Sequence, residues 1–250
     1  MISTLTVSHL INKNNYSEIR GIKALEYKNV QPVIDKELEC LFHSGMGIIQ
    51  RGFIEYVDSV IDYLNDNDFN LFSFDLGPAA EDVEYYDYFY ITKSAVIDKS
   101  QIKERIQRYI SYIKRKFKGI IALENLNYFP TPAYSTVCDA DFIKEVIEEN
   151  DVYLTLDIAH AIISANNLSI NLFNYLSSLP LDRVIEVHLS APGKKNGKWM
   201  DCHEKPGIKE VEALDFLAER IPTKSYLVVE YYKDFISLHT IYNDLQKYFQ

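Results

Sequence analysis

The chain has 250 residues, of which 47% are hydrophobic and 25% are charged, a balance typical of a folded globular protein. Its formal net charge of −10 argues against broad affinity for nucleic acid, because binding to phosphates requires clustered lysine and arginine. The three cysteines are widely spaced and give no disulfide framework. There is no secretory signal and no apolar run of about 18 residues, so we expect no membrane span and a cytoplasmic location. With no linker or internal repeat, we expect residues 1–250 to form one domain.

Short apolar segments bounded by turn residues predict β-strands along the whole chain. We expect eight of them, over Thr4–His9, Ile22–Tyr27, Glu39–His43, Asn70–Asp75, Gly119–Glu124, Val152–Asp157, Arg183–His188 and Ser225–Glu230. Helical periodicity lies between most of them and after the last, at Phe53–Leu64, Gln101–Lys116, Ala140–Glu149, Asn171–Leu179, Val211–Arg220 and Phe235–Tyr248. Strands that alternate with helices indicate right-handed βαβ units and a parallel sheet. Eight such strands in a chain of this length favour an α/β fold of the (β/α)8 TIM-barrel type.

Some segments depart from this alternation. Residues 12–21 are a poor helix candidate, and residues 28–38 leave room for only a short helix, so the first two units are less regular. Residues 77–93, with four tyrosines, and the Gly, Pro and Lys-rich residues 190–207 fit neither helix nor strand. We expect residues 77–93 to form a lid or substrate-facing loop, or an aromatic surface segment that packs outside the barrel or on another copy of the chain.

Six apolar segments, each at a predicted strand, end in a histidine or a carboxylate. The six residues are His43, Asp75, Glu124, Asp157, His188 and Glu230. If the strands are parallel and form a closed barrel, these side chains converge at one rim, where oxygen and imidazole ligands suit divalent metals. A buried carboxylate without a partner is costly, and most of the arginines fall on predicted helices away from that rim. A metal is therefore the expected partner of these carboxylates.

Two further residues extend this pattern. His160 stands three residues after Asp157, where the strand passes into its following loop, so both side chains can point into the same rim. Glu26 ends the second predicted strand, where we expect an outer ligand, a general base or a salt-bridged rim residue.

The order Glu124, Asp157, His188 and Glu230 at the ends of four successive strands resembles the xylose isomerase-like TIM-barrel superfamily. That superfamily includes sugar isomerases and epimerases and the endonuclease IV group. The resemblance covers roughly residues 38–232 and implies that these four side chains hold a catalytic divalent metal. It also implies that His160 binds substrate or a second metal. Asp201 and His203 form an Asp-x-His pair that resembles the multimetal branches of the superfamily.

Within the superfamily, the local sequence most resembles the multinuclear non-heme iron-dependent oxidase family. The resemblance rests on several motifs in the same order: His43–Gly47, Leu123-Glu124-Asn125, Asp141-Phe142, Tyr175-Leu176 through Leu179-Pro180 and Arg183-Val184 to His188-Leu189, and Asp201 to Pro206. Two positions depart from the pattern. Ser73-Phe74-Asp75-Leu76 stands in place of Ser-Asp-His-Leu, and Ala159-His160 stands in place of paired asparagines. Both departures alter the expected metal preference.

The complete set of candidate ligands has nine members: His43, Asp75, Glu124, Asp157, His160, His188, Asp201, His203 and Glu230. One metal cannot use nine ligands, so we expect two or three divalent ions a few Å apart. The resemblance implies iron first, with manganese or zinc as alternatives. We expect Glu124, Glu230 and His160 to be catalytic.

Four functions are compatible with these residues. The oxidase resemblance implies an oxidoreductase that acts on a cysteine-bearing peptide or small thiol, with a partner protein that delivers the peptide. The second hypothesis is a sugar or sugar-phosphate isomerase or epimerase, in which Glu124 and Glu230 move a proton. The third is an endonuclease IV-like zinc phosphodiesterase, which the charge disfavours. The fourth is a regulatory barrel whose metal site is vestigial. The oligomeric state does not follow from the sequence.

Overall fold

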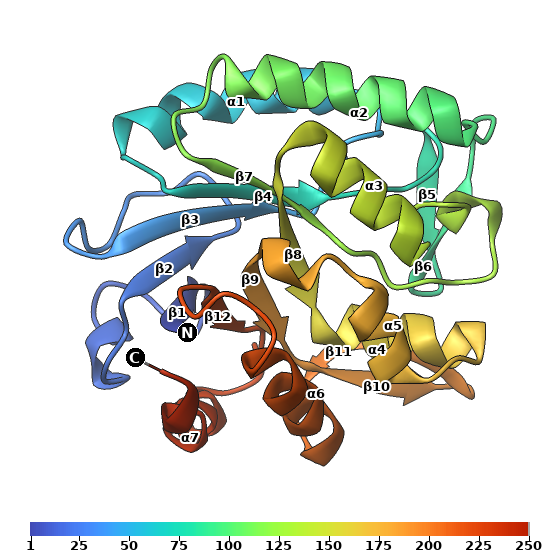
Figure 1. The fold of residues 1–250 in the computed structure, drawn as a ribbon. Helices are drawn as coiled ribbons and strands as arrows, with labels where there is room; N and C mark the ends of the chain where they lie inside the picture. The colour runs from blue at the N-terminus through green and yellow to red at the C-terminus, as the bar shows by residue number, and fades with distance from the viewer. Residues whose placement is uncertain (250) are drawn as a thin grey trace.

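The computed structural model describes residues 1–249, and its centre is a closed barrel of eight parallel strands (Figure 1). The order around the barrel is β1, β12, β9, β8, β7, β4, β3 and β2. These strands are β1 (Ile2–Val7), β2 (Ala24–Tyr27), β3 (Glu39–Ser44), β4 (Leu71–Asp75), β7 (Ile120–Glu124), β8 (Tyr153–Asp157), β9 (Val184–Leu189) and β12 (Tyr226–Val229). All eight predicted strands are confirmed, with ends that shift by about two residues at most.

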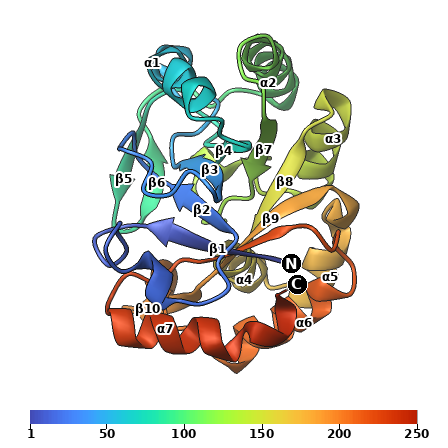
Figure 2. The ribbon, with the colours of Figure 1, turned by 90° about the vertical axis from the view of Figure 1, so that its left-hand side faces the viewer.

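Helices surround this ring, as the view along the barrel shows (Figure 2). They are α1 (Phe53–Asp66), α2 (Lys99–Lys114), α3 (Ala140–Asn150), α4 (Ile158–Leu168), α5 (Leu172–Ser178), α6 (Ile208–Ala218) and α7 (Phe235–Asp244). Each amphipathic helix buries one stripe against the barrel: in α1 the buried residues are Phe53, Val57, Val60, Ile61 and Leu64. The last predicted helix divides into α7 and a 3-10 turn at Gln246–Tyr248.

Helix α4 and two hairpins differ from the sequence prediction, whereas the irregular first two units agree with it. Helix α4 begins at Ile158, directly after β8, where we expected a loop. The two segments assigned to neither helix nor strand form antiparallel hairpins, β5 (Val83–Tyr86) with β6 (Phe89–Thr92) and β10 (Ala191–Lys195) with β11 (Lys198–Glu204). No α-helix follows β1 or β2 in the described part of the chain, where residues 8–23 contain only a 3-10 turn at Tyr16–Glu18.

The two hairpins lie at the end of the barrel toward which the arrowheads of β3 and β4 point (Figure 1). They touch each other, because Lys195 Nζ donates to Tyr88 Oη at 2.9 Å and Lys198 Nζ lies 3.6 Å from Asp87 Oδ2. The carboxyl ends of the strands are therefore flanked by two β-hairpins that meet at their turns.

The hydrophobic core has two parts. A large cluster fills the space between the strands and the surrounding helices. A small separate cluster contains Ala24, Leu41, Leu71, Ala122 and Tyr226, from the early positions of five barrel strands. Parallel strands covered on both faces are expected to be apolar throughout. In this barrel, the strand faces that pack against the helices are apolar throughout. The faces that point into the barrel are apolar only near the beginning of each strand.

None of the helices in residues 1–249 combines the length and apolar character needed to cross a lipid bilayer.

Candidate metal centre

Strand register brings the predicted ligands together at the carboxyl end of the barrel. Asp75 at the end of β4 pairs directly with Glu124 at the end of β7, and Asp157 of β8 pairs with His188 of β9. Glu230 follows β12, and its backbone N–H donates to Leu189 O. Carboxyl ends of parallel barrel strands converge, so side chains far apart in the sequence share one site.

Glu124 is central to this arrangement. Its Oε1 atom lies 3.0 Å from His188 Nδ1, and its Oε2 atom lies 3.3 Å from His43 Nε2. His160 Nδ1 is 3.9 Å from Glu124 Oε1. Burial opposes ionisation of Glu124, but the neighbouring histidines outweigh it and hold the pKa of this carboxyl well below its usual range. Glu124 is thus a carboxylate that three histidines approach from different strands and a helix.

Asp157 both begins helix α4 and contributes to the site. Its Oδ1 atom accepts a hydrogen bond from His160 N at 2.6 Å, which is the usual role of an N-cap aspartate. Its Oδ2 atom is buried and has no hydrogen-bond partner. Burial raises the pKa of Asp157 to about 7. An unpartnered carboxylate oxygen facing other ligand-type groups fits a bound cation.

His160 stands in the first turn of α4, with its side chain fixed from both ends. Nδ1 lies 2.8 Å from Asn125 O, and because a carbonyl only accepts, Nδ1 carries the proton. Nε2 lies 3.6 Å from Asp201 Oδ2, and although burial opposes protonation, Asp157 and Asp201 raise the pKa of His160 well above its usual range. The structure places His160 on a helix end and still turns it into the site.

Asp201 and His203 reach the site from hairpin β10–β11. His203 Nε2 lies 3.4 Å from Asp201 Oδ2 and 3.3 Å from Glu230 Oε2. The backbone of His203 adopts a left-handed conformation with φ of 46°, which is uncommon outside glycine. Burial opposes protonation of His203, but Glu230 outweighs it and raises its pKa to about 9. The hairpin therefore supplies two of the nine candidate ligands.

All nine predicted residues meet at this rim. Ligand atoms within 4.8 Å of one another form three groups there, namely His43 with Asp75 and Glu124, Glu124 with Asp157 and His160, and Asp157 with His188 and Glu230. Burial and the nearby Glu124 raise the pKa of Asp75 well above its usual range, since two adjacent carboxylates without a cation repel each other. Oxygen and imidazole donors in overlapping groups fit divalent metals. Their roles as ligands stay predictions.

Lys28 and Glu186 belong to this region but are not among the predicted site residues. Lys28 Nζ lies 2.5 Å from Glu230 Oε1 and 3.3 Å from Glu26 Oε1, and Glu186 is fully buried beneath His188. Both could have been found from strand alternation, because Lys28 is two residues beyond Glu26 and Glu186 is two residues before His188. Glu26 itself is fully buried and ion-paired with Lys28 and His188, while its role as a ligand or base stays a prediction.

A cavity of about 520 Å³ opens above these groups. Four tyrosines contribute to its wall, namely Tyr85 and Tyr90 of the β5–β6 hairpin, Tyr134 and Tyr232. Tyr90 N donates to Tyr134 Oη at 2.9 Å, so the hairpin is attached to the barrel beside the cavity. The tyrosine-rich segment thus faces the site, while Tyr86 of the same hairpin is exposed to solvent.

Residues 80–249 match the family model for the RiPP precursor modification enzyme MbnB/TglH/ChrH. The chain belongs to this family. Membership makes the chain part of a metal-dependent enzyme family with a TIM-barrel fold, consistent with the clustered donors at the rim. Residues 1–79, which supply His43 and Asp75, lie outside the matched range.

Curated relatives carry the description UPF0276 protein. One from Caulobacter vibrioides (strain NA1000 / CB15N) is 31% identical over 94 residues, which are 38% of this chain and 34% of that protein. Another from Nitrosospira multiformis is 27% identical over 147 residues, which are 58% of this chain and 50% of that protein. The chain thus spans between a third and a half of the length of these two relatives.

Solved structures share the fold over nearly the whole chain. A xylose isomerase domain containing protein from Salmonella typhimurium has a TM-score of 0.66 at 11% identity, covering 98% of this chain and 94% of its own. Endonuclease IV from Thermus thermophilus has a TM-score of 0.66 at 12% identity, covering 99% of this chain and 98% of its own. The protein therefore shares the TIM-barrel fold of these structures, the fold that the sequence resemblance implied.

Proposed function

We propose that this protein is an oxidase that uses two or three metal ions, iron first, to modify a cysteine-bearing peptide. One observation carries the proposal: Glu124 and Asp157 each belong to two of the three overlapping donor groups at the rim. A carboxylate has two oxygens and can bridge neighbouring metals, so shared carboxylates suit a multinuclear centre. Membership of a family that modifies RiPP precursors supports a peptide as the substrate.

Bound iron would supply an acceptor for the thiolate of the substrate and a route for electrons from that sulfur to dioxygen. The groups that would hold the ions are His43, Asp75 and Glu124 on one side and Asp157, His188 and Glu230 on the other, with His160, Asp201 and His203 at the hairpin side. Asp75 is an oxygen donor where the resembling oxidases have a histidine. The site of this chain therefore has more carboxylate character than their pattern.

The residues around the ions have distinct tasks in this proposal. Lys28 holds Glu230 through its ammonium group and keeps that carboxylate ionised. Burial alone would raise the pKa of Glu230, but Lys28 and His188 outweigh burial and lower this pKa well below its usual range. His160 Nδ1 donates to Asn125 O, so Nε2 is the atom that faces Asp201 and would either bind an ion or carry a proton near the incoming thiol. Glu124 has its oxygens between His43 and His188 and so fixes the positions of both rings.

The cavity wall indicates how a peptide would be held. Tyr85 and Tyr90 present aromatic rings from the hairpin, and Tyr232 packs against the ring of His203 at a centroid distance of 5.2 Å. Aromatic side chains provide large contact areas with little loss of conformational entropy. Tyr85 and Tyr86 are also among the most exposed large side chains, so the same hairpin is available to a peptide or to a protein that delivers it.

The proposal is tested by metal analysis together with oxygen uptake. The purified chain is loaded anaerobically with Fe²⁺, counted for metal per chain, and mixed with short synthetic peptides that contain one cysteine. Matched peptides with serine in place of cysteine are the control. We expect two or three irons per chain, and oxygen consumption with the cysteine peptides only.

Other outcomes would contradict it and select another chemistry. One manganese with exchange of a sugar carbon-bound proton would indicate an isomerase, and three zincs with cleavage at abasic sites would indicate a phosphodiesterase. A protein that retains only zinc or manganese and shows no iron-dependent oxygen uptake is not the proposed oxidase.

A further inference from the structure

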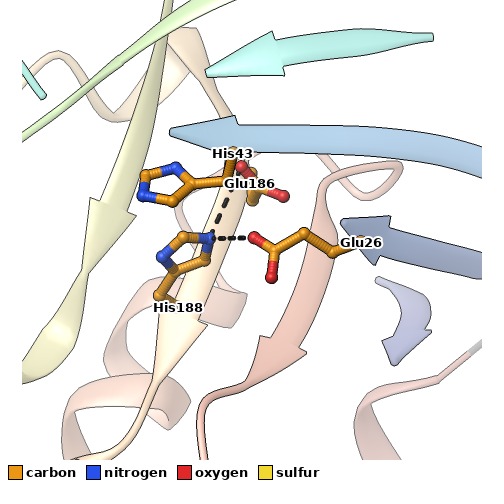
Figure 3. Close-up of side chains that lie close together, drawn as sticks. All are labelled: Glu26, His43, Glu186 and His188. Carbon is orange, nitrogen blue, oxygen red and sulfur yellow. Dashed lines mark ion pairs between the residues drawn. The ribbon is translucent and has the colours of Figure 1, made fainter. Parts of the chain in front are cut away.

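A second layer of ionisable groups lies inside the barrel beneath the rim. Glu26 of β2 and Glu186 of β9 are both fully buried, and they point toward the rings of His43 and His188 (Figure 3). One ligand-type atom from each of these four residues lies within 4.8 Å of the others. Two buried carboxylates in a barrel interior are costly unless they have a task.

Glu26 faces His188 from below. Glu26 Oε1 lies 3.0 Å from His188 Nε2 as an ion-pair contact, and neither atom has a well-aligned hydrogen-bond partner among the described residues. The other oxygen, Oε2, accepts a hydrogen bond from Thr6 Oγ1 at 2.9 Å, which fixes the carboxylate. Lys28 Nζ, 3.3 Å from Oε1, supplies a compensating positive charge. The proton-bearing nitrogen that best suits this acceptor is His188 Nε2.

Glu186 reaches His43 through a serine, and its Oε2 also lies 3.6 Å from His188 Nε2 (Figure 3). Glu186 Oε2 accepts hydrogen bonds from Ser73 Oγ at 3.2 Å and from Thr155 Oγ1 at 3.1 Å. Because Ser73 uses its single proton on Glu186, its oxygen is left to accept from His43 Nδ1 at 2.9 Å. The relay therefore requires that the proton of His43 be on Nδ1.

The opposite nitrogens of the two rings face the rim. His188 Nδ1 is hydrogen-bonded to Glu124 Oε1 at 3.0 Å, a bond that a metal at Nδ1 would replace, and His43 Nε2 lies 3.3 Å from Glu124 Oε2. A neutral imidazole has one protonated nitrogen and one lone pair. If the buried side holds the proton, the lone pair of each ring points to the candidate metal centre.

We propose that Glu26 and Glu186 are positioning residues that fix opposite tautomers of two metal-binding histidines. His188 is held with its proton on Nε2 and binds metal through Nδ1. His43 is held by Ser73 and Glu186 with its proton on Nδ1 and binds metal through Nε2. Carboxylates that accept from the second nitrogen of a metal-bound histidine orient the ring and raise its basicity. The inference rests on the metal centre of the proposed function.

The same four residues could instead form a metal site of their own. That arrangement would require His43 and His188 each to bind one ion at the rim and another below, which a neutral imidazole with one lone pair cannot do. It would also leave Ser73 without its acceptor on Glu186. The positioning role uses every one of these contacts.

Metal titration of the apoprotein tests the proposal without enzyme activity. Zn²⁺ and Mn²⁺ are titrated by calorimetry into the wild type and into Glu26→Leu, Glu26→Gln, Ser73→Ala, Glu186→Gln and the Ser73→Ala/Glu186→Gln double variant. Outer carboxylates contribute about 10- to 100-fold to metal affinity, so we expect losses of that size with an unchanged number of ions per chain. Glu26→Gln retains an acceptor and should lose less than Glu26→Leu.

The Ser73→Ala/Glu186→Gln double variant shows whether Ser73 and Glu186 act on His43 through one chain of hydrogen bonds or independently. If Ser73 and Glu186 act through one chain of hydrogen bonds, the double variant should bind metal no more weakly than the weaker single variant. Glu210→Gln is the matched control, because Glu210 is also a buried glutamate but accepts from Gly207 N at 2.8 Å, away from both histidines. It should bind metal as the wild type does.

Nitrogen-15 NMR of the histidine-labelled apoprotein at high pH provides the second readout. We expect a protonated Nε2 in His188 and a protonated Nδ1 in His43, with the preference of His43 lost in Ser73→Ala. Opposite tautomers, wild-type affinity in all variants, or the loss of one ion per chain in Glu186→Gln would overturn the proposal. A wild type that binds no metal would contradict the proposed function, whereas the tautomers would still be measured.

Discussion

The two ends of the barrel interior share the same strands but differ in chemistry. On β3 the inner side begins with Leu41 and ends with His43, and on β7 it begins with Ala122 and ends with Glu124. The first residues pack in the small apolar cluster, while the last residues lie among ligand-type groups. In TIM barrels the beginning of the strands serves stability and their end serves chemistry. One alternating pattern of residues thus carries both roles, and mutations at the two ends should separate stability from metal binding.

The largest expected effect is the loss of metal binding in Glu124→Gln. Glu124 belongs to two donor groups, so removal of its charge should lower metal affinity by more than about 100-fold, beyond the range of outer residues. Elemental analysis after dialysis against a defined metal buffer measures this. Glu210→Gln serves as the control for neutralising a buried glutamate. Wild-type metal content in Glu124→Gln would show that the polar end of the barrel is not the metal centre.

The apolar end should respond in stability and not in metal content. Leu71 is fully buried in the small cluster, so Leu71→Ala should lower the free energy of unfolding by about 2–5 kcal/mol. Urea denaturation of the apoprotein gives the difference. The number of ions bound per folded chain should equal that of the wild type, and a reduced number would mean that the two ends are coupled.

Metal should stabilise the fold from the polar end alone. A ligand at about 100 times its dissociation constant adds about 2.7 kcal/mol, so the thermal midpoint should rise on addition of metal and fall again with a chelator. In Leu71→Ala the thermal midpoint should start lower than in the wild type but rise by the same amount when metal is added. In Glu124→Gln the thermal midpoint should hardly rise when metal is added. A rise equal to that of the wild type would contradict the role of Glu124 as a metal ligand.

The smallest effect is expected at the hairpin above the cavity. Tyr85 lines the cavity, whereas Tyr86 is equally exposed, at 60% against 61%, and does not line it. Tyr85→Ala should weaken the binding of a fluorescently labelled cysteine peptide by about 1 kcal/mol, roughly fivefold, with Tyr86→Ala unchanged. Both variants should keep their unfolding free energy within about 0.5 kcal/mol. Equal effects of the two variants would remove the cavity as the peptide site.

Much of the fold was predictable because the barrel strands are short apolar runs with clear boundaries. Helix α4 was not predicted, since its start overlaps the end of β8 and Asp157 serves as both strand end and helix cap. The hairpin β10–β11 was also missed. Its glycine and lysine content suggests a loop, and its pairing depends on Gly193, where a Cβ would lie only 2.7 Å from Cys202 Sγ.

The candidate site was predictable where ligand-type residues end the barrel strands. The layer of side chains deeper in the barrel was less predictable. The positions of Glu26 and Glu186 relative to the histidines depend on strand register. That register includes an irregularity between Leu154 and Thr155, where β8 meets β9. Ser73 resembles any small strand residue in the sequence, and only its contacts with His43 and Glu186 reveal a link between them.

By itself, the sequence determined the eight parallel strands, the ligand types at their ends and the family resemblance. These are properties of local pattern, because alternation and apolar runs are encoded within a few residues. The tertiary structure decided which nitrogen of each histidine faces the rim, which glutamates support them, and which tyrosines line the cavity. Those features depend on contacts between strands and hairpins that lie far apart in the chain, and such contacts exist only once the barrel has closed.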